Sequence, residues 1–219
     1  PSVAARGLCK VFTKPRLRIG ELDQNHGRPR RAAPTVRSMK TAPISWRVFC
    51  AVELPPEVRA QLEDHIARLR KAVPDVAVSW SRVENIHLTL KFFGNVDVDR
   101  IEATSAAIDR AVKNVAPFDI SIGKTGTFRT QVLWIGVTDP SGTLSTLHEK
   151  LGSEDRAYRP HLTIARIRRP EGARRLANAH LQMQFENLNV AVKEIVLFRS
   201  ELSPKGSKYT SISTHKLPG

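Results

Sequence analysis

Two copies of one short pattern, His-x-Thr-x, contain the residues best suited to chemistry in this chain. The copies are His87–Leu90 and His161–Ile164, and each has one histidine, one threonine and two aliphatic residues. Their surroundings are typical of β-strands, in which alternate side chains share a face. The pattern therefore predicts that the histidine and threonine of each copy share one face of a strand, while the aliphatic residues enter a core.

Two such strands side by side would bring two imidazoles and two hydroxyl groups to one point. Imidazole titrates near neutral pH, so one ring can accept a proton while the other donates one. Hydroxyl donors such as Thr89 and Thr163 can stabilise the charge that develops on phosphate oxygens. A zinc site needs three or four close ligands, and no cysteine, acidic residue or further histidine shares these faces. We therefore predict acid–base chemistry on a phosphodiester, with no metal and no cofactor.

Composition indicates a globular protein with an excess of positive charge. The chain has 219 residues, is 41% hydrophobic and carries a net charge of +14, which suits a polyanionic substrate. No apolar run is long enough to cross a membrane. The only cysteines, Cys9 and Cys50, suggest neither a disulfide framework nor a zinc site, and Cys50 lies in an apolar run that predicts a core position. We expect a cytoplasmic, monomeric protein.

Residues 1–38 differ from the rest of the chain. They contain nine Lys and Arg residues against two acidic ones, are punctuated by proline and glycine, and lack any regular hydrophobic period. We predict a disordered basic extension, and Met39 offers an alternative translation start, in which case residues 1–38 would be an upstream segment. The folded domain is predicted to span residues 39–219.

Helical and strand periodicities alternate from Trp46 onward and predict an α+β fold with two halves, each carrying one motif strand. Gly94-Asn95 is expected to end the first motif strand, and Asp97 or Asp99 to cap the helix that follows. Helices are predicted from Pro56 to Val73, from Asp97 or Asp99 to about Val115, around Leu144, Leu147 and Leu151, and at 171–181. Strands are predicted at 47–54, 76–80, 86–93, 118–122, 132–137, 161–167, 190–198 and 209–215.

Aromatic residues near the motifs are candidates to stack on a nucleobase. The candidates are Phe92, Tyr158 and Phe128, and Tyr158, which precedes the second motif strand, is preferred. Phe92 is expected in the core, because it shares the parity of Leu88 and Leu90. The three tryptophans are also predicted core residues, and histidines outside the motifs have no predicted role.

Two longer segments, Trp80–Gly94 and Tyr158–Arg166, resemble the signatures of bacterial RNA 2′,3′-cyclic phosphodiesterases, the 2′-5′ RNA ligase-like branch of the 2H phosphoesterase superfamily. The resemblance continues in Phe49–Pro55, Val132–Trp134 and Leu197–Leu202, and it covers about Trp46 to Lys216. It implies a bilobal, pseudo-twofold fold, with two antiparallel sheets flanking a central cleft and helices on the outside.

The same resemblance implies metal-independent opening of a 2′,3′-cyclic phosphate at an RNA end, which leaves a 2′-phosphate. It would make His161 the general base and His87 the general acid, and it would place Thr89, Thr163 and Arg166 on the phosphate. The motifs by themselves leave the order of acid and base open. Arg166 stands five residues after His161, so a regular strand would turn it away, and it reaches the phosphate only if the strand ends, twists or bulges near Ala165.

Three further functions stay open from the sequence. Reverse-direction 2′-5′ ligation to a 5′-hydroxyl RNA end would use the same groups. The segment Thr143–Arg159 and the loop before Val132 are shorter than in the family, which would fit an RNA-end binding protein with little turnover. A third alternative is a phosphodiesterase for a small cyclic nucleotide such as ADP-ribose 1″,2″-cyclic phosphate.

Overall fold

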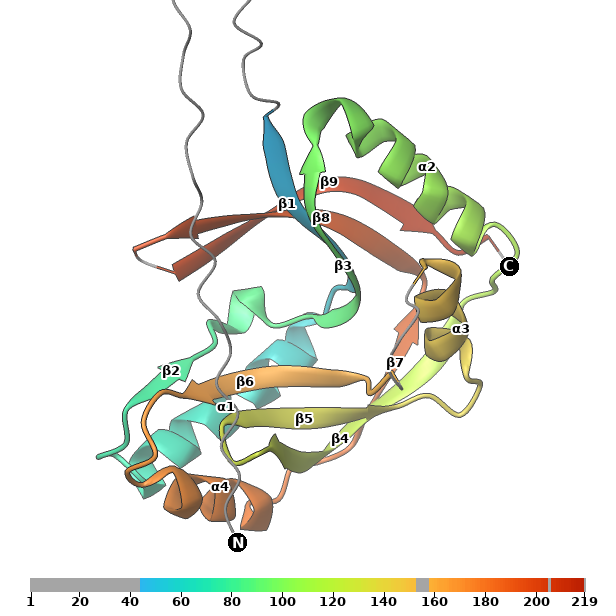
Figure 1. Ribbon diagram of the computed structural model, residues 1–219. Coiled ribbons are helices and arrows are strands. Elements are labelled where there is room, and N and C mark those ends of the chain that lie inside the picture. The colour runs from blue at the N-terminus through green and yellow to red at the C-terminus, as the bar shows by residue number, and fades with distance from the viewer. Residues whose placement is uncertain (1–43, 153–157, 205, 219) are drawn as a thin grey trace, which may run out of the picture. The chain divides into compact units, whose positions relative to one another are not determined.

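Nine antiparallel strands in the described part of the chain form two sheets that face each other (Figure 1). The computed structural model describes residues 44–152, 158–204 and 206–218. The predicted extension, residues 1–38, and Cys9 lie outside this part. The four-stranded sheet has the order β3 (Leu88–Asp97), β1 (Ser45–Val52), β8 (Glu194–Ser203) and β9 (Gly206–Lys216). The five-stranded sheet has the order β2 (Val78–Trp80), β6 (His161–Ile167), β5 (Val132–Thr138), β4 (Phe118–Phe128) and β7 (Leu188–Val192).

Helices α2 and α4 lie on the outer sides of the two sheets, and α3 lies at their flank, as Figure 1 shows. Helix α2 packs on β9 and α3 packs on β3, whereas α4 packs on β4 and on α1. The predicted α+β class, with two antiparallel sheets and helices outside, is confirmed. No helix in the described residues is long and apolar enough to span a membrane. The helices are α1 (Pro56–Ala72), α2 (Ile101–Val112), α3 (Thr143–Lys150) and α4 (Ala173–Gln182), with short 3-10 turns at Val83–Asn85 and Val98–Arg100.

Sequence periodicity explains the best-defined helix, α1. Proline at its first position has a backbone angle already suited to a helix and lacks only an N–H that would be unpaired there. Its predicted apolar positions, spaced by three or four residues, are all buried in the main core. These residues are Val58, Leu62, Ile66, Leu69 and Val73.

The lobes are not formed by consecutive halves of the chain. Strand β2 comes just before the first motif but pairs with β6, the second motif strand. Helix α1, also from the N-terminal half, packs beside α4 under the five-stranded sheet (Figure 1). The last two strands then return to the sheet that holds β1 and β3. Each lobe therefore depends on segments from both halves, which connects the two sheets covalently several times.

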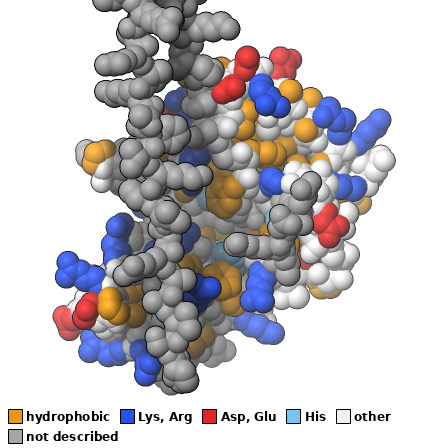
Figure 2. All heavy atoms as spheres, in the orientation of Figure 1, with side chains coloured by type: hydrophobic (Ala, Val, Ile, Leu, Met, Phe, Trp, Pro, Cys, Tyr) orange, Lys and Arg blue, Asp and Glu red, His pale blue; other side chains and the backbone are white. Residues whose placement is uncertain are grey.

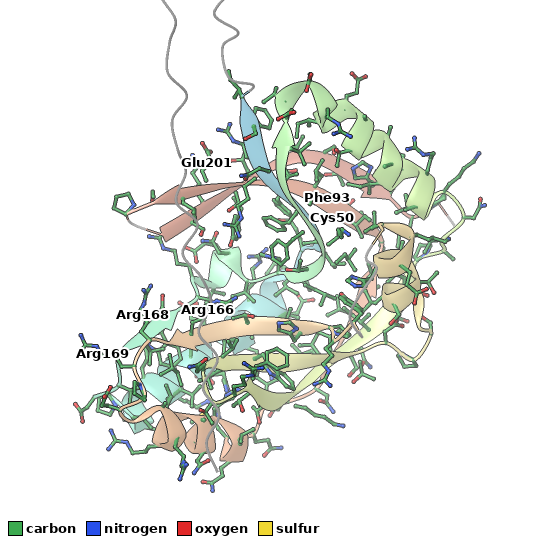
Figure 3. The ribbon with its side chains drawn as sticks, in the orientation of Figure 1. Cys50, Phe93, Arg166, Arg168, Arg169 and Glu201 are labelled. Carbon is green, nitrogen blue, oxygen red and sulfur yellow. The ribbon has the colours of Figure 1, made fainter. Side chains whose placement is uncertain are left out.

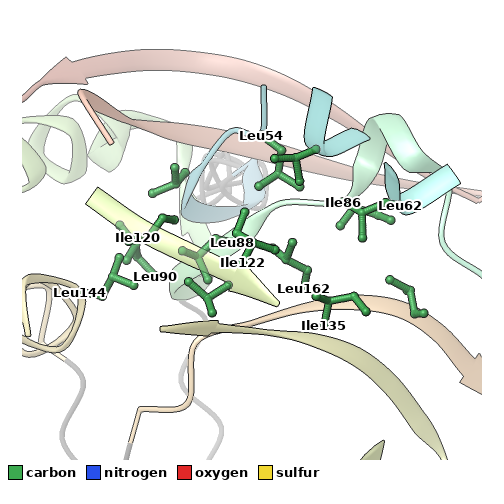
Figure 4. Packing of buried hydrophobic residues seen from close by; sticks show 14 of the residues in the cluster. Leu54, Leu62, Ile86, Leu88, Leu90, Ile120, Ile122, Ile135, Leu144 and Leu162 are labelled. Carbon is green, nitrogen blue, oxygen red and sulfur yellow. The ribbon is translucent and has the colours of Figure 1, made fainter. Parts of the chain in front are cut away.

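The motif aliphatic residues belong to one core that extends across both sheets, shown in Figure 4. Leu88 and Leu90 are 0% and 1% exposed, and Leu162 and Ile164 are fully buried. Burying each such side chain typically contributes about 1.5–3 kcal/mol. Cys50 is also buried, as predicted, and desolvation raises the pKa of its thiol to about 12. The core thus fixes the motif strands from behind.

Three predicted details of the fold were wrong. Gly94 and Asn95 do not end the first motif strand, which continues to Asp97, because the positive φ of Gly94 lets the chain pass through an irregularity in its pairing with β1. No aspartate side chain caps α2, which follows a 3-10 turn. The single strand predicted at 190–198 is two strands in different sheets, separated at Lys193.

A buried pair of histidines joins α1, α4 and β5. Nε2 of His180 donates to the carbonyl oxygen of Trp134 at 3.1 Å, since a carbonyl can only accept. Nδ1 of His180 is then the acceptor, and Nε2 of His65 donates to it at 3.0 Å. Nδ1 of His65 has no hydrogen-bond partner among the described residues. Both rings are therefore neutral, and burial lowers both pKa values, that of His65 to about 4.

Candidate active site

The two motifs meet across a cleft of about 200 Å³ between the sheets. His87 lies just before β3, and His161 is the first residue of β6. Figure 2 shows histidine atoms beside hydrophobic atoms near the middle of this face. All four predicted polar motif residues line the cleft, and so does Arg166. The lining consists of Ser81, Asn85, Ile86, His87, Thr89, Phe92, His161, Thr163, Arg166 and Tyr209.

The two imidazoles are held in the same way. Nδ1 of His87 donates to the carbonyl oxygen of Asn85 at 2.8 Å, and Nδ1 of His161 donates to that of Arg159 at 2.7 Å. In both motifs the acceptor stands two residues before the histidine. Because Nδ1 carries the proton, Nε2 of each neutral ring has its lone pair available. Either Nε2 can therefore accept a proton from water or, once protonated, give one to a leaving oxygen.

Aromatic residues surround His87. Phe49 stacks on its ring at 4.6 Å between centroids, and Tyr209 contacts it edge-on at 5.3 Å. Burial lowers the pKa of His87 to about 4, opposed by its hydrogen bond to Asn85 and reinforced by the nearby Arg59. His87 is consequently neutral at pH 7 in the free protein. An anionic phosphate beside Nε2 would raise this pKa, because an opposite charge favours the protonated form.

His161 has a different aromatic neighbourhood. The ring of Phe128 is perpendicular to it at 5.0 Å, and Trp134 lies at 6.4 Å. The prediction that Trp134 belongs to the core was wrong, because Leu133 and Ile135 occupy the core face of β5 and Trp134 points to the other. A second hollow, of about 420 Å³, adjoins His161 and is lined partly by Phe128 and Trp134.

A bulge in β6 places Arg166 at the cleft. Leu133 pairs with Ala165 but its neighbour Trp134 pairs with Thr163, so Ile164 is an extra residue in the ladder. Ile164 and Ala165 are both fully buried, which breaks the alternation of faces. Arg166 therefore lies on the side of His161 and Thr163. This bulge is the irregularity near Ala165 on which the predicted position of Arg166 depends.

A matching bulge in β3 places Phe92 at the cleft. Ala51 pairs with Thr89 and Cys50 pairs with Lys91, which leaves Leu90 as the extra residue. Phe92 is 60% exposed and lines the cleft, so the prediction of a core position was wrong. In both motifs the extra residue stands three positions after the histidine and the displaced side chain five positions after it. The pseudo-twofold arrangement thus offers an aromatic ring on one side and a guanidinium group on the other.

Two hydroxyl groups bond the backbone at the motif threonines, and the first of them connects the two sheets. The Tyr158 hydroxyl, from the segment before β6, donates to the backbone carbonyl of Thr89 at 2.9 Å. The Ser81 hydroxyl, from the segment before β3, donates to that of Thr163 at 2.8 Å. One face of the Tyr158 ring stacks on His148 at 4.3 Å. These contacts favour a positioning role for Tyr158, and its predicted stacking on a nucleobase stays a prediction.

Some residues of this site were not predicted from the sequence. Ser81 stands inside the first signature, but its partner Thr163 is distant in sequence. Phe49 and Tyr209 come from β1 and β9, and no local pattern connects them with a histidine. Among the described residues, no group of three or more His, Cys, Asp or Glu side chains could hold a metal ion.

Comparison with known proteins identifies the family. A model of the 2′-5′ RNA ligase superfamily matches residues 54–204. The chain belongs to this superfamily. It is 33% identical over 186 residues to an RNA 2′,3′-cyclic phosphodiesterase of Methanothermobacter thermautotrophicus, covering 78% of this chain and 98% of that protein.

Solved structures of the superfamily share the fold. Escherichia coli LigT in complex with 3′-AMP matches with a TM-score of 0.64 at 25% identity, over 80% of this chain and 100% of LigT. LigT in complex with ATP matches with a TM-score of 0.64 at 28% identity, over 79% and 98% of the two chains. The fold that the resemblance implied is therefore confirmed.

Proposed function

We propose that this protein is an RNA 2′,3′-cyclic phosphodiesterase that uses its two motif histidines as base and acid. The observation that carries the proposal is the pair of imidazoles, each fixed through Nδ1 by a backbone carbonyl and lining the same cleft as both threonines. The name of the Methanothermobacter relative supports the same reaction. The substrate is RNA, or an oligonucleotide, that ends in a 2′,3′-cyclic phosphate.

In the proposed reaction, Nε2 of His161 takes a proton from water as the water oxygen attacks phosphorus. The bond from phosphorus to the 3′ oxygen breaks, and protonated Nε2 of His87 gives its proton to that oxygen. The product is a 2′-phosphate beside a free 3′-hydroxyl. Each proton transfer typically contributes about 10²–10⁴-fold in rate.

Thr89, Thr163 and Arg166 are proposed to bind the phosphate oxygens. The cleft contains all three side chains, and the guanidinium group can donate two parallel hydrogen bonds to an oxyanion. Fixed donors at a developing charge are worth roughly 3–4 kcal/mol each in well-studied enzymes. No metal ion or cofactor takes part in this proposal.

The assignment of His87 as the acid depends on the substrate. Its lowered pKa means that the free protein holds it neutral at pH 7. The negative charge of the phosphate must raise the pKa of His87 before the ring can donate a proton. The positive charge of Arg166, which acts in the opposite direction, must not cancel this rise. The opposite assignment, with His87 as the base, uses the same geometry, and the titration of His87 with a bound phosphate, discussed below, tests whether His87 can be the acid.

Analysis of the products tests the proposal. A short RNA that ends in a 2′,3′-cyclic phosphate is incubated with the protein in EDTA, and the ends are resolved by mass and by phosphatase sensitivity. We expect an EDTA-resistant conversion to the 2′-phosphate alone. A 3′-phosphate product would contradict the proposed leaving group, and tight binding without turnover would support an RNA-end binding protein instead.

Ligation is the reverse use of the same groups, with a 5′-hydroxyl RNA end in place of water. The superfamily name supports testing it, by adding such an RNA and detecting a 2′-5′ linkage. Faster turnover of ADP-ribose 1″,2″-cyclic phosphate than of RNA ends would favour the small-nucleotide alternative. The monomeric state and the cytoplasmic location remain predictions from the sequence.

A further inference from the structure

A groove of about 520 Å³ adjoins the cleft and opens between β2, the end of β6 and the β8–β9 hairpin. Arg166, Tyr209, Ser81 and Asn85 line both hollows, so the groove continues the cleft outward. The remaining lining comes from Ser79, Trp80, Arg82, Arg168, Leu202, Ser203, Pro204, Gly206 and Ser207.

The groove is positively charged. Arg82, Arg166 and Arg168 line it and are exposed, and none of the described lining residues is acidic. Figure 3 shows Arg166, Arg168 and Arg169 in a row at the end of β6. Glu201 on the nearby hairpin pairs with Arg199 at 2.9 Å and does not line the groove. A polyanion leaving the cleft would therefore meet arginine side chains along this path.

Strand β6 connects the reaction centre with the groove. Beyond the bulge, Arg166 and Arg168 stand two residues apart with the buried Ile167 between them, so both arginines share one face. This is also the face of His161 and Thr163. Their spacing along the strand is about 6.6 Å, since each residue advances the chain by about 3.3 Å. Strand β6 and the residue directly after it, whose N–H still bonds the Ala77 carbonyl at 3.1 Å, thus present a base, a phosphate ligand and two cations in sequence.

The uncharged residues that line the groove suit a single-stranded nucleic acid. The Ser207 hydroxyl can bond a ribose 2′-hydroxyl, the group that distinguishes RNA from DNA, and the Ser79 hydroxyl, which accepts from Arg168 at 3.2 Å, can still donate to one. The ring of Tyr209 and the side chain of Leu202, which is 72% exposed, offer apolar surface to bases.

We propose that this groove binds the RNA strand on the 5′ side of the terminal cyclic phosphate, with Arg82 and Arg168 contacting backbone phosphates. The inference rests on the proposed function and makes the protein an enzyme for oligonucleotide ends rather than for mononucleotides. A cyclic mononucleotide occupies the cleft alone, whereas an oligonucleotide also occupies the groove.

The test compares two substrates in one double variant, Arg82→Gln with Arg168→Gln. We expect kcat/KM for a cyclic-phosphate-ended oligoribonucleotide to fall about tenfold at low salt, since exposed charge pairs each contribute little. The rate with a 2′,3′-cyclic mononucleotide should not change. The dependence of log kcat/KM on log salt should flatten by about 1.4, that is about 0.7 for each lost phosphate contact with single strands. Arg110→Gln, on the exposed side of α2, is the matched control and should change neither rate.

Each outcome decides the inference. If the double variant keeps its kcat/KM for the oligonucleotide, or loses activity equally with both substrates, the proposed binding of RNA in the groove is wrong. If the unmutated protein hydrolyses neither substrate, the proposed function fails, and binding of the labelled oligonucleotide then tests the groove by fluorescence anisotropy. Weaker binding by the double variant than by the Arg110→Gln control would support it, and equal binding would overturn it.

Discussion

His87 and His161 have matching backbone contacts but different surroundings. Phe49 covers one face of the His87 ring, and Tyr209 contacts its edge, whereas Phe128 contacts His161 at right angles. This difference is the physical basis on which two identical side chains could divide acid and base roles.

We expect His87 to titrate near pH 4 in the free protein and at a higher pH when a 2′-phosphorylated nucleotide is bound. Burial penalises the imidazolium, and the phosphate charge offsets that penalty. Imidazole chemical shifts measured by NMR over a pH series, with His161→Ala for assignment, provide the measurement. A pKa of His87 that does not rise on binding would contradict its role as the acid.

The variant Tyr158→Phe distinguishes a role of Tyr158 in positioning Thr89 from a role in stacking on a nucleobase. The variant keeps the ring that stacks on His148 but loses the hydroxyl donated to Thr89. If Tyr158 positions Thr89, kcat should fall about fivefold, equivalent to a lost hydrogen bond of about 1 kcal/mol, with KM little changed. Ser81→Ala, which removes the corresponding bond to Thr163, should behave alike. An unchanged kcat in Tyr158→Phe would contradict the positioning role and leave base stacking as the predicted role of Tyr158.

At the scale of single elements, β5 connects the active site with the helices beneath it. An ideal Cβ built on Gly126 in β4 would lie 2.1 Å from the Trp134 ring, so alanine there must displace the indole that flanks His161. We expect Gly126→Ala to lower the free energy of unfolding by about 1–3 kcal/mol and to reduce activity. Urea denaturation and initial rates check both effects. A fully active, equally stable variant would show that Trp134 is not fixed by this contact.

The buried histidine pair under β5 predicts acid sensitivity. The pKa of His65 in the folded state is lowered to about 4, whereas an unfolded chain keeps it near 6.5. The unfolded state therefore binds more protons between these values, and stability decreases as pH falls through this range. From pH 7 to about pH 5 we expect a loss of roughly 2 kcal/mol from His65.

The variant His65→Gln isolates this contribution, because it has no titrating group but retains an N–H that could bond His180. Its free energy of unfolding should decrease less between the two pH values than that of the unmutated protein. The measurement is urea denaturation at both pH values, with Asp64→Asn as a control beside it. An equal decrease in the variant would show that groups other than His65 cause the acid sensitivity.

The sequence predicted the strands and helices well where periodicity is strong and failed where an element departs from regularity. Alternation within His161–Ile167 placed Leu162 and Ile164 in the core correctly. It could not locate the extra residue in either ladder, because a bulge is defined by the partner strand. For this reason Phe92 was expected in the core, and Arg166 could be placed only on the condition that the strand was irregular.

At the scale of the whole molecule, the cleft depends on segments that are far apart in the sequence. Tyr209 reaches the site from the last strand, and Phe49 from the first, so no short motif could predict either residue. Ser81 and Tyr158 each bond the other motif's strand, which couples the positions of both threonines. A change that separates the lobes should therefore affect both motifs together.

The predicted domain boundary gives a test at this scale. Residues Ala42–Gly219 form one compact unit. A fragment of residues 39–219 should unfold in a single transition and hydrolyse a cyclic mononucleotide at the rate of the full chain, because every residue of the cleft lies within it. Denaturation followed by fluorescence, together with initial rates, checks this. A large loss of activity would show that residues 1–38 contribute to the site.

The most direct test of the central claim measures hydrolysis of a 2′,3′-cyclic nucleotide in EDTA by the unmutated protein and by His87→Ala and His161→Ala. His26→Ala, in residues 1–38 and outside the cleft lining, serves as the control for replacing a histidine. We predict EDTA-resistant activity that yields a 2′-phosphate and falls at least about 10²-fold in each motif variant, with most activity kept in the control. Comparable activity in either motif variant, or activity abolished by EDTA, would contradict the two-histidine mechanism.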